Sequence, residues 1–123
     1  REEGRDADEA RTASFAAAAE AGVRSVIGTD ANGICVEFGD QHEELRLMQR
    51  AFGWTSERTL RAGTSDAADA IRLTGTTGRI APGLGADFVV VRGRPWEDID
   101  QLTIENIVAV VARGVVVSGT LPA

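Results

Sequence analysis

The first half of the chain combines helix-forming stretches with one short apolar run. Residues 6–22 are predicted to form a helix, because acidic residues stand near their amino end, an alanine run follows, and Gly22 suits the stop. Residues 23–27, in which Val23, Val26 and Ile27 are apolar, follow directly and are predicted to form a short buried strand. A helix, a tight turn and an apolar strand make up one step of an alternating α/β fold.

Three further helices are predicted before residue 75. The first is capped by Asp40 and reaches Phe52, with apolar residues at helical spacing and a glycine at its end. A short helix begins at a cap formed by Thr55 or Ser56, and another is capped by Ser65. The apolar stripe of this last helix is expected to consist of Ala68, Ile71 and Leu73.

The pattern changes after residue 75. Residues 75–85 contain four glycines and a proline, a density that excludes a helix. Valine-rich runs at 88–91, 107–111 and 115–117 predict strands, and Arg113-Gly114 predicts a tight turn that joins the last two into a hairpin. The single strand of the first half has no parallel neighbour, so the α/β fold is expected to be incomplete on its own.

Composition narrows the classes of function. A net charge of -6 and a pI near 4.7 argue against a nucleic-acid partner or an anionic membrane surface. All 13 basic residues are arginine, so no lysine can serve as a Schiff base or general base. The single cysteine, Cys35, excludes an internal disulfide. No stretch approaches the roughly 20 apolar residues of a membrane span, and the first residues do not resemble a signal peptide, so we expect a cytoplasmic chain.

Three partial motifs depart from the functional patterns that they resemble. Residues 42–46 begin like a zinc-protease helix, but Arg46 occupies the position of the second histidine. Residues 83–87 have the glycines of a dinucleotide-binding loop, but they precede a strand instead of opening a helix. Residues 30–33 begin like a calcium loop, but the glycine comes too early and the distal carboxylate is missing. None of the three supports a site.

Asp30 is the leading candidate for chemistry. It stands just past the end of the predicted strand, and active sites of α/β proteins gather at the carboxyl ends of parallel strands. On spacing alone, a plain turn explains residues 29–33 more readily, because Asp and Asn bond to their own backbone and Gly33 suits a positive φ. Both interpretations remain open at this point.

Six segments share their order and spacing with one known family. They read Gly28-Thr29-Asp30-Ala31, His42-Glu43-Glu44-Leu45, Gly53-Trp54-Thr55, Gly83-Leu84-Gly85-Ala86-Asp87-Phe88-Val89-Val90-Val91, Trp96-Glu97-Asp98-Ile99 and Val110-Val111-Ala112-Arg113-Gly114-Val115-Val116-Val117. Together they resemble the carboxyl-terminal third of the amidohydrolase superfamily, in its imidazolonepropionase-like and Xaa-Pro dipeptidase-like branch. The resemblance implies that residues 1–75 form the final part of a (β/α)8 TIM barrel, with strand 8 and the helices after it. Residues 76–123 would form a segment of a composite β-sandwich.

The resemblance also implies a role for Asp30. It would be the strand-8 aspartate, which binds the catalytic metal directly or through its water, takes a proton from the attacking water and passes it to the leaving amine. Zinc, as one or two ions, is the expected metal, because it lowers the pKa of bound water toward about 7. A carboxylate beside that cation stays ionised and can still accept a proton. His42 would point toward the substrate pocket, or else be a surface or capping histidine.

The remaining metal ligands of the family cannot be placed, since the chain has one histidine and no lysine. We therefore expect a complementary amino-terminal chain, separated by gene splitting or cleavage, that supplies histidine ligands, or else a fragment of a longer chain. The sequence predicts a segment or subunit of a metal-dependent hydrolase that cleaves a peptide or cyclic amide bond. The complete unit would form a homo-oligomer and bind neither nucleic acid nor membrane. The alternative is a non-catalytic scaffold protein that retains the architecture.

Overall fold

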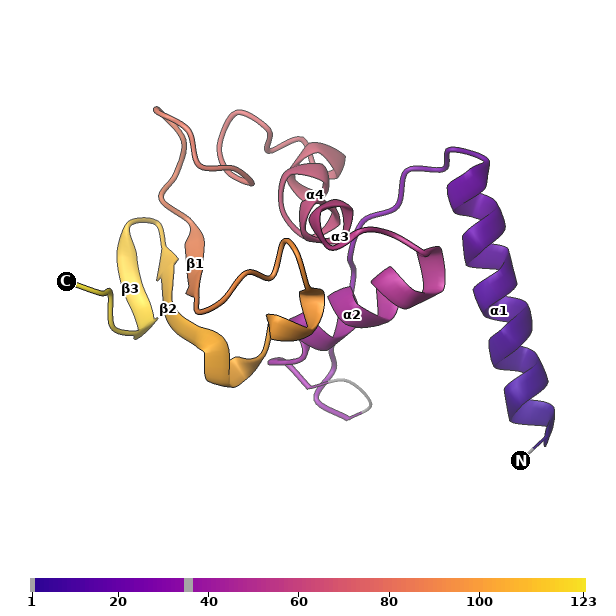
Figure 1. The fold of residues 1–123 in the computed structure, drawn as a ribbon. Coiled ribbons are helices and arrows are strands. Elements are labelled where there is room, and N and C mark those ends of the chain that lie inside the picture. The colour runs from indigo at the N-terminus through magenta and orange to yellow at the C-terminus, as the bar shows by residue number, and fades with distance from the viewer. Residues whose placement is uncertain (1, 35–36) are drawn as a thin grey trace.

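The computed structural model, which describes residues 2–34 and 37–123, has helices first and strands last. In the described part the order is α1 (Glu2–Glu20), α2 (Gln41–Phe52), α3 (Ser56–Ala62), α4 (Ser65–Ala70), β1 (Phe88–Val91), the short 3-10 helices η1 (Ile99–Gln101) and η2 (Ile104–Asn106), β2 (Ile107–Ala112) and β3 (Val115–Gly119). Figure 1 shows α1 at one end, the sheet at the other, and α2 to α4 between them. Among these described helices, none is both long and apolar enough to cross a membrane.

Local signals set most helix ends where they were predicted. At the end of α1, Gly22 has a φ of 75° and the Val23 N–H donates to the Ala18 carbonyl at 3.0 Å, which is the bonding of a Schellman motif. Helix α2 ends at Gly53, also left-handed. The Thr55 side chain accepts a hydrogen bond from the Arg58 N–H and so caps α3. These three signals each lie within a few residues of the helix end that they set.

The prediction for the fourth helix was wrong at both ends. The N-cap is Thr64 and not Ser65, and the Thr64 hydroxyl makes no cap bond because it donates back to the Leu60 carbonyl at 2.8 Å. The helix ends at Ala70, so the expected apolar stripe is broken. Ile71 lies past the helix with 68% of its surface exposed, and Leu73 is 39% exposed.

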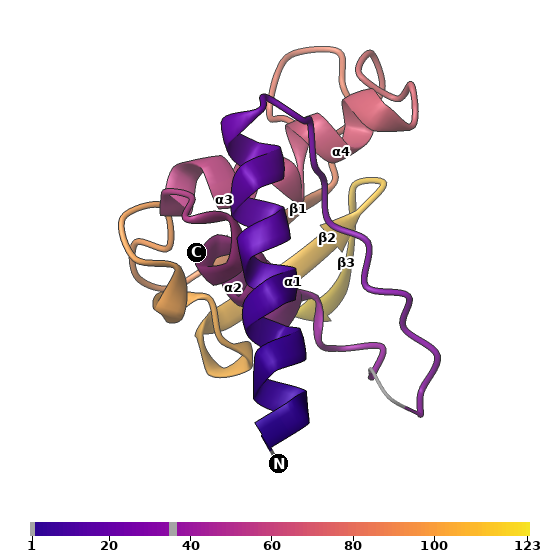
Figure 2. The same ribbon diagram turned by 90° about the vertical axis from the view of Figure 1, so that its right-hand side faces the viewer.

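Residues 23–27 are extended but form no strand within the described chain. A strand needs a hydrogen-bonded neighbour, and the described residues offer no strand beside this segment. Instead, the Ile27 N–H donates to the carbonyl of Ala62 at the end of α3, at 3.2 Å. After α1 the segment turns back and passes the other helices, as Figure 2 shows from the side of α1.

The three described strands form one antiparallel sheet in the order β1-β2-β3. The predicted hairpin between β2 and β3 is confirmed, with Ala112 opposite Val115. Its turn residues Arg113 and Gly114 have φ values of 51° and 78°, the pair of left-handed conformations that a two-residue hairpin turn requires. The predicted strands thus pair with one another within the second half of the chain.

The described core is small. Its buried apolar residues come from α2 to α4, the η1 region and β2, and Thr59 is the largest side chain that is fully buried. Several large apolar side chains stay exposed, among them Leu47 on α2 and all three valines of β3. A run of exposed valines is unusual for the surface of a free-standing domain and is typical of a contact surface.

A buried hydroxyl joins the two halves of the chain. Ser56 Oγ accepts hydrogen bonds from the Ile99 N–H at 3.1 Å and from Gln49 Nε2 at 3.0 Å, and it lies 3.4 Å from the Glu97 carbonyl. These bonds hold the η1 segment against α2 and α3, so the helical half and the β half are packed together. The predicted division after residue 75 stays a prediction.

Asp87 links β1 to the hairpin, and this link predicts a pH dependence. Its carboxylate accepts hydrogen bonds from the Arg113 backbone N–H at 2.8 Å and from the Thr77 hydroxyl at 3.0 Å, and these bonds lower the pKa of Asp87. Because the pKa of Asp87 is lower in the folded protein than in the unfolded chain, the ionised carboxylate stabilises the fold. This stabilisation is complete above the unfolded pKa of about 3.9, and it is lost as the pH falls through the folded pKa.

The Asp87→Asn variant is therefore expected to be less stable than the unmodified protein at neutral pH. The difference in unfolding free energy, measured by denaturation in urea at a series of pH values, should shrink as the pH falls below about 4. A difference that is the same at all pH values would show that the charge of Asp87 does not act through these two bonds.

Candidate functional site

Asp30 lies in a turn directly beyond the extended segment. It is exposed and has a φ of 48°, in the left-handed region that Asp adopts more readily than most residues. The Thr29 hydroxyl accepts a hydrogen bond from the Ala31 N–H at 3.3 Å, and the Asn32 side chain accepts one from the Ile34 N–H at 2.9 Å. Thr29 and Asn32 thus each bond to the backbone two residues ahead, and Gly33 has the expected positive φ, of 72°, while the Asp30 residue itself is exposed.

His42 lies in the first turn of α2, with 11% of its side chain exposed. Its Nδ1 lies 3.2 Å from the Gly39 carbonyl oxygen, and its Nε2 lies 3.6 Å from Glu43 Oε1. The imidazole is therefore in contact with the backbone just before α2 and with the neighbouring Glu43. Its expected contact with substrate stays a prediction.

A charged network that includes residues distant in sequence surrounds this end of α2. Arg46 donates to Glu43 at 2.5 Å and to Asp100 at 3.2 Å, and these two hydrogen bonds raise the pKa of the guanidinium. Glu105 has a lowered pKa, chiefly through bonds from its own backbone N–H and the Thr103 hydroxyl, and then through the nearby His42 and Arg46. The sequence did not predict this network, because Arg46 and Asp100 lie more than fifty residues apart.

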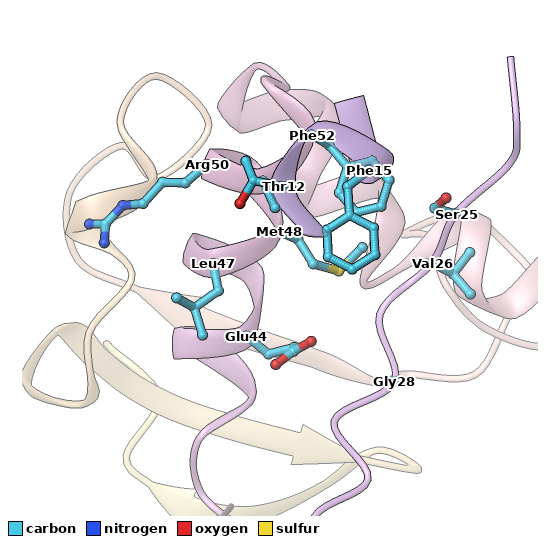
Figure 3. Close-up of a pocket in the computed structure, with 11 residues that line it drawn as sticks. Thr12, Phe15, Ser25, Val26, Gly28, Glu44, Leu47, Met48, Arg50 and Phe52 are labelled. Carbon is cyan, nitrogen blue, oxygen red and sulfur yellow. The ribbon is translucent and has the colours of Figure 1, made fainter. Parts of the chain in front are cut away.

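An apolar groove of about 720 Å³ lies between α1, the extended segment and α2. Figure 3 shows Phe15, Met48 and Phe52 turned toward one another across it, while Arg50 extends away. Phe15 and Phe52 stack with ring centroids 5.1 Å apart. Neither Asp30 nor His42 is among the residues that line this groove, so it does not bring the two candidates together.

The described residues do not fit a metal ion by themselves. Nowhere in residues 2–34 and 37–123 do three or more His, Cys, Asp or Glu side chains come together in a way that could hold a metal. A catalytic zinc site uses about three protein ligands and a water, and Asp30 offers one carboxylate. Any such site that includes Asp30 requires ligands from elsewhere.

Comparison with known proteins gives one family match and several similar solved structures. Residues 6–121 match the model of the amidohydrolase family. Solved structures with similar folds include a Xaa-Pro dipeptidase with methionine bound in its active site (31% identity, TM-score 0.77, covering 88% of this chain and 25% of that one). No curated protein matches the chain.

Two further solved structures are similar to this chain. One is a candidate prolidase from Bifidobacterium longum (28% identity, TM-score 0.78, covering 86% of this chain and 26% of that one). The other is a prolidase complexed with N-methylphosphonate-L-proline (31% identity, TM-score 0.74, covering 89% of this chain and 26% of that one). The chain therefore spans about a quarter of the length of the solved structures that it matches.

Proposed function

This chain belongs to the amidohydrolase family, and we propose that it is one part of a metal-dependent hydrolase that cleaves an amide bond. The observation that carries the proposal is the match of residues 6–121 to the family, together with an exposed carboxylate, Asp30, at the end of an apolar extended segment. The other three-quarters of the matched structures would correspond to a complementary part. The complementary part would supply the metal ligands that this chain lacks.

In this proposal the chain supplies the last part of a barrel in sequence order and the segment that follows it. Residues 1–75 would be the final part of the (β/α)8 barrel, with residues 23–27 as its last strand, and residues 76–123 would be a β-sandwich segment. Two observations support this placement. Residues 23–27 have no strand partner in the described chain, and the valines of β3 are exposed. Both would gain neighbours in a complete protein.

Asp30 would carry the proton in the proposed reaction. Its carboxylate would accept a proton from the attacking water and donate that proton to the leaving amine, so that the C–N bond breaks without releasing a free amide anion. Its exposed position past the extended segment leaves it accessible to water and substrate. His42 would contribute to substrate binding. The family is typically metal-dependent, and zinc is the metal that we propose for the complete site.

The substrate class that we propose first is a dipeptide with a carboxyl-terminal proline. Among the matched structures are a Xaa-Pro dipeptidase and a prolidase bound to a proline phosphonate. A cyclic amide is the second class to assay. The loops that select substrate in a barrel follow all of its strands, so most of them would lie in the complementary part.

The decisive experiment isolates the protein with whatever chain accompanies it and determines intact masses, bound metal and hydrolysis of Xaa-Pro dipeptides. We expect a larger histidine-rich polypeptide to accompany or extend this chain, and we expect a chelator to abolish hydrolysis and added zinc to restore it. If the native assembly contains no metal and no additional histidines, the hydrolase proposal is wrong.

A further inference from the structure

One dipeptide in the turn after the extended segment has chemistry that the proposed hydrolysis does not use. Asn32 is followed by Gly33, and both residues are exposed. Glycine has no side chain to crowd its backbone nitrogen, so this nitrogen can reach the carboxamide carbon of a preceding asparagine. Attack at that carbon closes a five-membered ring and can displace the amide group. Asn-Gly is therefore the pair of residues in which an asparagine loses its amide most readily.

The folded turn keeps the Asn32 carboxamide close to the backbone. Asn32 Oδ1 accepts a hydrogen bond from the Ile34 N–H at 2.9 Å, so the carboxamide is folded back over Gly33. The same bond stabilises negative charge on Oδ1, which is where charge develops when a nucleophile adds to this carbonyl. Gly33 has a φ of 72°, a conformation that its missing side chain permits. The turn thus holds Asn32 near the nitrogen that would attack it.

We propose that Asn32 is a site of spontaneous deamidation, in which the Gly33 nitrogen displaces the side-chain amide. A base from solvent removes the Gly33 N–H proton, and the nitrogen bonds to Asn32 Cγ. The Cγ–Nδ2 bond then breaks, and Nδ2 takes up a proton and leaves as ammonia. Water opens the resulting succinimide at either carbonyl and gives aspartate or isoaspartate. The net reaction consumes one water and releases one ammonia, and no oxidant or reductant takes part.

The second asparagine of the sequence, Asn106, differs from Asn32 in each of these respects. It precedes Ile107, whose β-branched side chain crowds the backbone nitrogen. The Ile107 N–H already donates to the Thr103 carbonyl at 3.2 Å, and the Asn106 side chain donates to the Gln101 carbonyl at 2.8 Å. Asn106 is therefore an internal control within the same molecule.

Deamidation changes the turn that contains Asp30. Aspartate places a new negative charge two residues after Asp30, and isoaspartate also moves a side-chain methylene into the main chain. The reaction needs only Asn32, Gly33 and water, so it does not depend on the proposed function. It is compatible with that function, because a loop that follows the last strand of a barrel would lie at the open mouth of the site.

The test incubates the protein as isolated in mildly alkaline buffer for several days and follows its tryptic peptides by mass spectrometry. Cleavage at arginine gives peptide 25–46 with Asn32 and peptide 93–113 with Asn106. We expect peptide 25–46 to gain the small mass that replacing NH2 with OH adds, at least about tenfold faster than peptide 93–113. Fragment spectra should place the change at Asn32 and should show isoaspartate among the products.

Two variants separate ring closure from other losses of the amide. Asn32→Gln lengthens the side chain, so that ring closure would have to form a six-membered ring. Gly33→Ala adds a Cβ beside the attacking nitrogen, 3.4 Å from the Phe38 ring. Each variant should slow the mass gain of peptide 25–46 at least about tenfold. Equal rates at Asn32 and Asn106, aspartate without isoaspartate, or conversion only after unfolding in urea would each overturn the proposal.

Discussion

Replacing Asp30 with Asn is expected to lower the kcat of the complete assembly by about two to four orders of magnitude. An amide has nearly the same shape as the carboxylate but can neither take a proton from water nor return it to the leaving amine. Asn also tolerates the left-handed φ of 48° at this position, so the turn should be preserved. The loss of rate should therefore come from chemistry and not from unfolding, and melting curves of the two proteins should coincide.

The control for this experiment is Glu37→Gln, which neutralises another exposed carboxylate on the same loop. It should leave kcat within about twofold of the unmodified protein, as is usual for surface changes away from a site. If Asp30→Asn turns over substrate as fast as this control, Asp30 is only a turn residue. That result would favour the plain-turn interpretation of residues 29–33 over the catalytic one.

The features predicted correctly from the sequence are those encoded within a few residues. Gly22 and Gly53 end helices because glycine adopts the left-handed conformation without strain, and Thr55 caps α3 because its hydroxyl reaches an N–H three residues ahead. Arg113-Gly114 closes the hairpin for a similarly local reason. No distant contact has to be known to make any of these predictions.

The end of α4 shows how a local signal can mislead. Arg72 ends this helix with a φ of 63°, and the Leu73 N–H donates to the Ala68 carbonyl at 2.8 Å, so the motif is one that normally uses glycine. An arginine gives no hint of a helix end at that position. The spacing of Ala68, Ile71 and Leu73 therefore predicted a longer apolar stripe than the helix has.

The candidate site was predictable only in part. Asp30 could be picked out because the end of a mostly apolar run and a turn-forming residue are both visible in the sequence. The contacts of the segment before it were not predictable, because Arg58 meets Ser25 only when α3 packs against the extended segment. The packing of Ile99 against Ser56 is of the same kind. Contacts between residues far apart in the chain leave no periodic signal, so they appear only in the folded structure.

Gly78→Ala is expected to destabilise the protein by about 2–5 kcal/mol, the largest stability effect of any change considered for this chain. Gly78 has a φ of +91°, and a Cβ atom there would lie 2.5 Å from the Ala68 Cβ and 3.1 Å from the Thr64 carbonyl oxygen. These neighbours belong to the start and middle of α4, so they cannot move aside as a flexible side chain could. The substitution should therefore push the loop away from α4.

Gly83 provides the matched control because it separates backbone strain from crowding. It lies in the same loop with a φ of +86°, but a Cβ atom there would meet nothing within 4 Å. Gly83→Ala should therefore cost only the strain of the left-handed conformation, about 1–2 kcal/mol, and the excess cost of Gly78→Ala measures the contact with α4. Urea denaturation followed by circular dichroism gives both values. Equal costs for the two variants would mean that the loop does not pack on α4 as closely as these distances imply.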